Sequence, residues 1–136
     1  MEISVSKEQG RVPVTVMHLK GQLDSQTYQQ LIDKARDEVN MGASHILLDL
    51  GDLSYISSAG LVSLHTVALL LRGESLPDPE QGWSALKSMD RTRDGGMQEN
   101  LKLLNPRPEV ISVLDMVGFS AFFEAFTDKQ KAIDSF

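Results

Sequence analysis

Two adjacent serines, Ser57 and Ser58, are the residues whose type and position most favour chemistry in this sequence. They lie between a short apolar run, residues 45–50, and a stretch from 61 to 71 whose apolar residues recur at helical spacing. These patterns predict a buried strand and then a helix, so the serines stand at the helix start. The unpaired N–H groups there carry partial positive charge, which favours an N-cap hydroxyl and equally an added phosphate.

Residue types alone leave the role of the serines open. Serine is a preferred N-cap residue, so one or both could serve only to begin the helix. A strand-to-helix turn is also where hydrolases place a nucleophilic serine. However, Ile56-Ser-Ser-Ala-Gly60 lacks the glycine that such a turn has two residues before the nucleophile. A phosphorylation switch does not follow from the residue types by themselves.

The elements that position the serines follow from the spacing of apolar residues. Residues 3–5 and 12–19 alternate as two strands, predicting a hairpin that ends at Gly21. Asp24 or Ser25 then caps a helix whose apolar face runs from Tyr28 to Val39. The strand at 45–50 follows, with residues 51–57 as a turn and a helix from 58 to about 72. The crossover places that strand parallel to one strand of the hairpin.

The second half of the chain continues the α/β alternation. Residues 101–104 form a short apolar strand, and Asn105-Pro106 predicts a helix start that leads to a helix ending at Gly118. A further strand is expected near residues 123–126, and Thr127-Asp-Lys-Gln130 predicts a capping box for a last helix. Between about residues 74 and 99, prolines, paired glycines and charges predict a surface loop inserted into one domain that spans residues 1–136.

Composition narrows the function classes. The net charge of −6 argues against a nucleic-acid surface, which needs a basic stripe. The chain has no cysteine, and no spacing of histidines and carboxylates predicts a metal site. It has no glycine-rich phosphate loop or dinucleotide fingerprint either, so we expect no cofactor. Without a signal peptide or an apolar run long enough to cross a bilayer, the expected location is the cytoplasm.

Three motifs resemble the STAS domain, and in particular the bacterial anti-sigma-factor antagonists. The family pattern of a strand, an Asp-Leu/Val-Ser-aromatic turn and Asp-Ser-Ser/Thr-Gly-Leu is similar to Asp52-Leu-Ser-Tyr-Ile-Ser-Ser-Ala-Gly-Leu61. The family's Gly-Glu-Leu-Asp corresponds to Gly21-Gln-Leu-Asp24, and its C-terminal apolar helix to Pro106–Phe119. The resemblance covers residues 1–73 and 100–136. It implies a mixed, partly parallel sheet of four to five strands with helices packed mainly on one face.

The resemblance also implies a function without catalysis. The chain would be a phosphorylation-switched binding module that sequesters an anti-sigma factor with serine-kinase activity and so frees a sigma factor. Ser58 rather than Ser57 aligns with the phosphoacceptor, and a PP2C-type phosphatase would reset the switch. The implied partner-binding residues are Asp24, Ser57, Ser58, Ala59, Gly60 and Leu61.

One departure keeps a second function open. Ser57 stands where the family has an aspartate, and Ala59 stands where it has a second small hydroxyl residue. Aspartate and serine are nearly equivalent as N-caps, so the helix start should survive the exchange. Recognition by a kinase depends on more than the cap. The alternative is a constitutive scaffold or transport-associated STAS subunit that docks onto a transporter ATPase or a sensory assembly, with the serines acting only as a helix cap.

Overall fold

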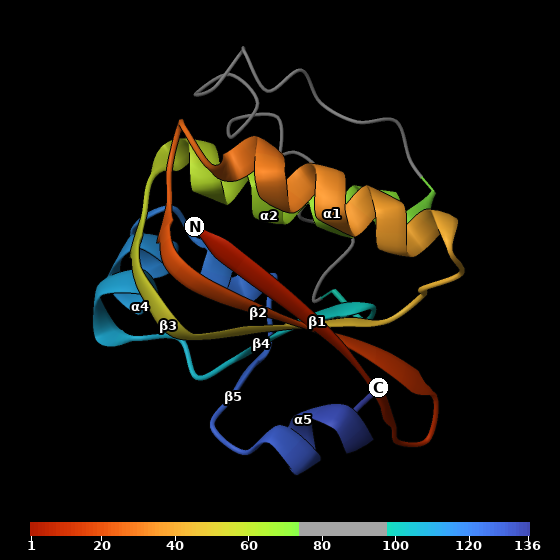
Figure 1. Cartoon of the computed structure of the whole chain (residues 1–136). Coiled ribbons are helices and arrows are strands. Elements are labelled where there is room, and N and C mark those ends of the chain that lie inside the picture. Colours follow the sequence, from red (N-terminus) through yellow and green to blue (C-terminus); the bar gives the residue numbers. More distant parts are fainter. Residues whose placement is uncertain (74–97) are drawn as a thin grey trace.

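The computed structural model describes residues 1–73 and 98–136 (Figure 1). Nearly all of the insertion predicted at about 74–99 lies outside the described residues. In chain order the elements are β1 (Glu2–Gln9), β2 (Pro13–Leu23), α1 (Tyr28–Asn40), β3 (Ile46–Ile56), α2 (Ser58–Arg72), β4 (Leu101–Leu104), α4 (Pro108–Met116), the 3-10 helix η3 (Phe119–Ala121), β5 (Ala125–Phe126) and α5 (Lys129–Asp134).

The strands form one mixed sheet in the order β1-β2-β3-β4-β5. The β1–β2 pair is antiparallel, and the pairs β2–β3, β3–β4 and β4–β5 are parallel. The predicted mixed, partly parallel sheet of four to five strands is therefore confirmed, with five strands present, as is the parallel pairing of the third strand with a hairpin strand. Helices α1 and α2 lie side by side over one face of the sheet, while α5 lies against the other (Figure 1).

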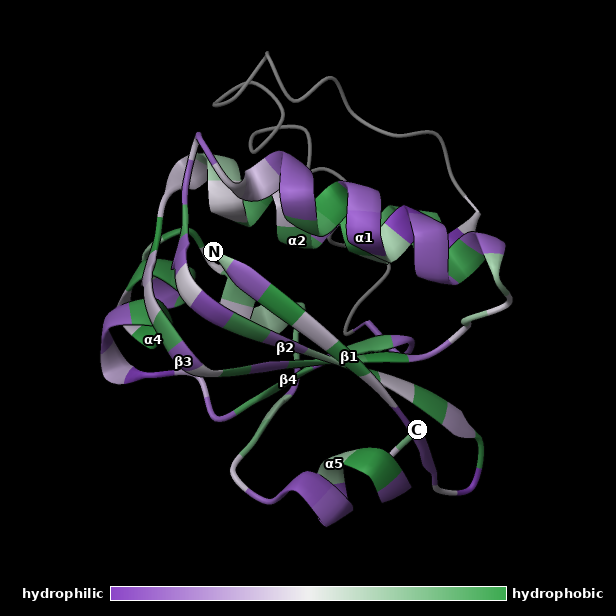
Figure 2. Cartoon of the chain, in the orientation of Figure 1, coloured by the Kyte–Doolittle hydropathy of each residue, from purple (hydrophilic) through white to green (hydrophobic). Residues whose placement is uncertain are grey.

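Each face of the sheet has its own apolar core. The larger core joins α1, α2 and α4 to inward-facing strand residues such as Met17, Leu48 and Leu103. Figure 2 shows α1 alternating between hydrophilic and hydrophobic residues, as expected of a helix with one buried face. The smaller core lies under α5 and includes Leu47 and Ile133. Most of the helices thus cover one face, as predicted, and α5 covers part of the opposite one.

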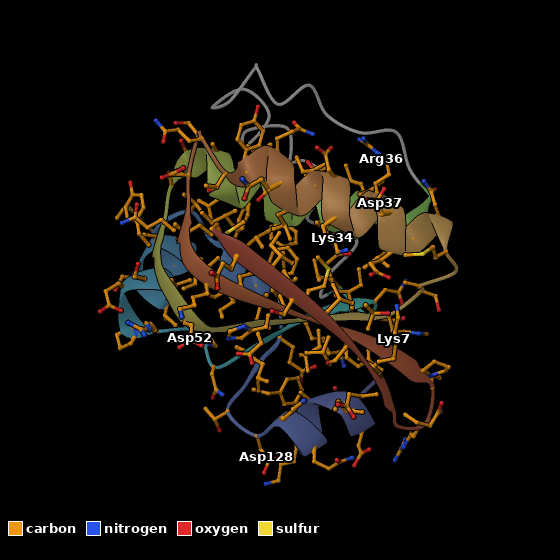
Figure 3. All side chains as sticks on the ribbon, in the orientation of Figure 1. Lys7, Lys34, Arg36, Asp37, Asp52 and Asp128 are labelled. Carbon is orange, nitrogen blue, oxygen red and sulfur yellow. The ribbon has the colours of Figure 1, made fainter. Side chains whose placement is uncertain are left out.

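One polar contact fixes α1 to the sheet, and another caps the start of α5. Lys7 of β1, labelled in Figure 3, donates a hydrogen bond from its Nζ to Oε2 of Glu38 at 2.9 Å, and Glu38 is buried on α1. This pair holds the C-terminal half of α1 over the edge strand. At α5, the Oδ1 atom of Asp128 accepts from the Lys131 backbone N–H at 3.0 Å. The last helix therefore begins at an aspartate cap within the predicted capping-box stretch.

The predicted turn at residues 51–57 is wrong, because β3 continues without a break to Ile56. Its register with β2 slips between the pairs His18–Asp49 and Lys20–Asp52, and slips again before Gln22–Tyr55. Each slip gives β3 one extra residue relative to β2, which is a β-bulge. The bulges change which residues face the larger core, so Leu53 lies in that core although simple alternation from Leu48 and Leu50 would turn it to the opposite face.

Three predicted element boundaries also need correction. Gly21 does not end β2, which continues to Leu23; Gly21 has φ +116°, a conformation that favours glycine. The first helix begins at Tyr28, later than a cap at Asp24 or Ser25 would require. Helix α4 begins at Pro108, not at Pro106.

Candidate functional site

The start of α2 presents one serine to solvent and uses the other as a cap. Ser57 has an extended backbone, and its Oγ accepts a hydrogen bond from the Gly60 N–H at 3.3 Å. Ser58 is the first residue of the helix and is exposed. The two candidate hydroxyls therefore differ in availability. The Ser58 side chain is accessible to solvent, whereas the Ser57 hydroxyl is engaged in capping the helix.

The position of Ser58 is set by tight packing between the ends of β2, β3 and α2. The Ser57 N–H donates to the Leu23 carbonyl at 2.9 Å, which links the carboxyl ends of the two strands. Gly60 lies directly over this link, because a Cβ atom there would be 2.6 Å from the Leu23 carbonyl oxygen and 2.7 Å from Ile56 Cγ1. Any larger residue would push the helix start away from the sheet. The glycine of the motif is thus a packing requirement.

Asp24 lies in the turn that follows β2 and helps to shape it. Its Oδ1 accepts from the Gln26 N–H at 2.9 Å, and its own N–H donates to Thr27 Oγ1 at 2.9 Å. The Thr27 hydroxyl in turn donates to the Gln22 carbonyl at 2.8 Å. The carboxylate is partly exposed, so it contributes negative charge to the surface while holding the turn.

The six predicted partner-binding residues fall into two groups. Ser58 is exposed, and Asp24, Ser57 and Ala59 are partly exposed. Gly60 and Leu61 are buried, with Leu61 only 1% exposed, so they pack the helix start and offer a partner little surface. We call the remaining four residues, Asp24, Ser57, Ser58 and Ala59, the Ser58 surface.

Tyr55 is an exposed residue that the sequence reasoning did not select. It lies two residues before Ser57 at the end of β3, its side chain is an exposed large apolar group, and it pairs with Gln22 of β2. An exposed aromatic side chain next to a candidate contact surface is typical of an interface anchor. The motif itself contains this aromatic residue, so the sequence could have indicated it. The direction of its side chain could not be predicted, because it depends on the bulges in β3.

In the part of the chain that the structure describes, neither serine has a neighbour that would activate its hydroxyl. Within residues 1–73 and 98–136, no histidine or carboxylate is hydrogen-bonded to either serine, whereas a nucleophilic serine needs an adjacent base. His65 of α2 is partly buried, and burial followed by the charge of Arg72 lowers its pKa to about 4. In the same ranges, no group of three or more metal-ligating side chains could hold a metal ion, and no helix is long and apolar enough to cross a membrane.

The comparisons with known proteins agree with this fold. The protein named "Putative anti-sigma factor antagonist BtrV", from Bordetella bronchiseptica, is 27% identical over 136 residues, which cover 100% of this chain and 95% of BtrV. A Thermotoga maritima structure described as a putative anti-sigma factor antagonist superposes with a TM-score of 0.69 at 16% identity, covering 97% of this chain and 92% of that one.

A further structural relative has been solved in two modification states. SpoIIAA of Bacillus, in its phosphorylated form, superposes with a TM-score of 0.52 at 21% identity, covering 98% of this chain and 97% of that one. The unphosphorylated form of SpoIIAA gives a TM-score of 0.53 at 19% identity, covering 98% and 96%. These likenesses confirm the predicted STAS-like α/β fold. The family model described as "Mlab, STAS domain" matches residues 7–77, just over half of the sequence, and the chain belongs to the STAS domain family.

Proposed function

We propose that this protein is an anti-sigma-factor antagonist, a binding module that acts without catalysis. The Ser58 surface binds an anti-sigma factor that has serine-kinase activity, and this binding frees a sigma factor. The similarity to BtrV over the full length of the chain supports the class. The observation that carries the proposal is the difference between the two serines: Ser58 is exposed at the first position of α2, while Ser57 caps the helix.

The physical effect of phosphorylation at Ser58 follows from its place on the helix. A phosphate adds about −1.5 to −2 charges, which the N-terminus of a helix tolerates because its N–H groups carry partial positive charge. The fold should therefore persist. The penalty falls on the interface, since a charge that is buried against a partner without a matching cation destabilises the complex. The nearby carboxylate of Asp24 adds to the negative potential that a partner would meet.

The switch is completed by a PP2C-type phosphatase that removes the phosphate and restores binding. The proposed location is the cytoplasm, where a sigma factor acts. Residues 1–136 would form one domain with the insertion at about 74–99, and the Ser58 surface belongs to the described part of that domain.

The test combines mass spectrometry with binding. The protein is incubated with ATP and the serine kinases of the anti-sigma class from its own organism, and the modified residue is mapped. We expect phosphate on Ser58 and none on Ser57. Ser58→Asp should weaken kinase binding by at least about tenfold, or about 1.4 kcal/mol, while Ser58→Ala keeps binding but accepts no phosphate. Ser112→Asp, at an exposed serine of α4, serves as the matched control for added charge.

A second function is favoured by the residue at position 57. The family aspartate is replaced by a serine whose hydroxyl is engaged as the helix cap, so the motif here performs its structural role without the family's acidic residue. In that case the chain is a constitutive subunit that docks onto a transporter ATPase or a sensory assembly. Equal binding of Ser58→Ala and Ser58→Asp to a native partner, with no phosphate from any cognate kinase, would support this function and reject the first.

A further inference from the structure

An exposed hollow lies between α4, η3 and the edge of the sheet, and none of the residues that line it belongs to the Ser58 surface. Its floor consists of buried apolar side chains: Leu103 of β4, Leu114 of α4 and Phe123. Its rim includes two exposed residues, Ile111 of α4 and Ala125 of β5. We call this hollow the α4–β5 groove. An exposed isoleucine, 40% accessible, beside a buried apolar floor indicates a surface that can take up an apolar group.

The size of the groove decides what kind of group it can take. Its volume is about 280 Å³. Pockets that enclose a small-molecule ligand commonly have volumes of about 300–1,000 Å³ and bury most of the ligand surface. This groove lies just below that range and is open to solvent. It therefore suits one or two apolar side chains of a larger partner better than a free ligand.

The edge strand beside the groove turns the backbone groups of one residue away from the sheet. In the sheet of the described residues, β5 is the terminal strand. The carbonyls of Glu124 and Phe126 accept from the N–H groups of Leu103 and Asn105 at 3.0 and 2.7 Å, so both point toward β4. Because backbone groups alternate along a strand, the N–H and C=O of Ala125 point away from β4. An extended segment can pair there by adding to the sheet edge.

The charges at the rim of the groove determine whether a positively or a negatively charged partner is favoured. Glu124 lines the groove and its side chain is 47% exposed. Asp115 is exposed and accepts a hydrogen bond from the hydroxyl of Ser120, another rim residue. Lys102 approaches Glu124 at 3.3 Å, but its ammonium is buried and donates to the carbonyl and hydroxyl of Ser135 at 3.0 Å each. Among the described residues that line the groove, the accessible charge is therefore negative, and the net charge of the chain is also negative.

We propose that the α4–β5 groove docks an extended segment of a partner protein, in which an apolar side chain is flanked by lysine or arginine. The apolar side chain occupies the space over Leu114 and Phe123. The backbone of the segment pairs with Ala125, and its cations meet Glu124 and Asp115. This surface is separate from the Ser58 surface, so it allows a second partner to bind while the first is held or released.

The probe is a fluorescein-labelled heptapeptide with one central leucine flanked by lysines and threonines. We expect it to bind the full chain with a Kd below about 1 mM, and binding should weaken as salt rises because the cations are screened. Amide chemical shifts should change at Ile111, Ser120, Phe123 and Ala125. A peptide with serine in place of leucine, and one with glutamates in place of the lysines, should bind at least about tenfold more weakly.

Two substitutions on one helix provide the matched test. Ile111→Lys places a cation at the groove and should weaken peptide binding at least about tenfold. Met116→Lys makes the same charge change on α4 at a residue that is 81% exposed and does not line the groove, so binding should stay within about twofold. Ala125→Pro is the second variant, because it removes the outward N–H of the edge strand without removing a bond to β4. It should also weaken binding.

Several results would overturn the proposal. These are an absence of binding, chemical-shift changes confined to other residues, or an equal loss of binding in both lysine variants. Equal affinity for the glutamate peptide would also reject it, since the charge argument would then be wrong. Self-association of the unlabelled protein that Ile111→Lys abolishes and the peptide fails to compete would instead assign the groove to a second copy of the chain.

Discussion

Replacing Gly60 by alanine separates what helix propensity alone predicts from what the packing dictates. Alanine is more favourable than glycine within a helix by up to about 1 kcal/mol, so propensity predicts a gain in stability. The structure predicts a loss, because the new Cβ would lie 2.6 Å from the Leu23 carbonyl oxygen and 2.7 Å from Ile56 Cγ1. Overpacking of this kind costs about 1–3 kcal/mol.

The carbonyl that obstructs the new Cβ cannot simply rotate away. It accepts the hydrogen bond from the Ser57 N–H that joins the ends of β2 and β3. If the helix start shifts to relieve the clash, this bond weakens, at a further cost of about 1 kcal/mol. Set against the propensity gain, the net loss is about 1–3 kcal/mol, which lowers Tm by at least about 3 °C for a chain of this size.

Thermal and denaturant unfolding of Gly60→Ala and wild type measure this loss, and Ala59→Gly is the control. Ala59 is partly exposed one position earlier, so its replacement changes propensity without a steric clash and should cost less than about 1 kcal/mol. Since Gly60→Ala also displaces Ser58, partner binding should fall with stability. An unchanged or higher Tm for Gly60→Ala would refute the reasoning, because it would show that the ends of β2 and β3 can shift to make room for the new Cβ without loss of stability.

Three further predictions concern other contacts. In urea unfolding, Ser57→Ala should lower the free energy of unfolding by about 0.5–2 kcal/mol because it removes the N-cap, whereas Ser57→Asp should keep the wild-type value. Equal stability of Ser57→Ala and wild type would show that the hydroxyl does not cap α2. The pKa of His65 is lowered from 6.5 to about 4 in the folded protein, so its contribution is fully present above pH 6.5 and is lost as pH falls toward 4. Allowing for partial exposure, this loss should be about 1–2 kcal/mol and should disappear in His65→Gln; the same pH dependence in that variant would contradict the assignment. Lys102→Ala should cost about 2–4 kcal/mol because the side chain is buried, with its ammonium over the rings of Phe126 and Phe136, while Glu124→Gln should cost less than about 1 kcal/mol because that carboxylate is half exposed; the reverse order would mean that the ion pair dominates.

Much of the fold is predictable from local pattern. The order of strands and helices, the parallel crossover between β2 and β3, and the start of α2 at the serine pair all follow from apolar periodicity and cap chemistry. These features depend on residues close together in the chain, where spacing and propensity act directly. The exposure of Ser58 at the first helical position is also a local feature, because a residue in the first turn after a cap has few neighbours on its own helix.

Other features depend on residues far apart in the chain. The bulges in β3 turn Leu53 toward the core, and they are defined only by the pairing of β3 with β2. The roles of Gly60 and Leu61 depend on the Leu23 carbonyl and on the core beneath α2, so a motif resemblance assigns them to an interface while the packing assigns them to the interior. The α4–β5 groove likewise exists only where α4 meets the sheet edge. Local sequence determined where the serines stand, and tertiary packing decided which neighbouring residues a partner can reach, because burial depends on contacts that local spacing does not encode.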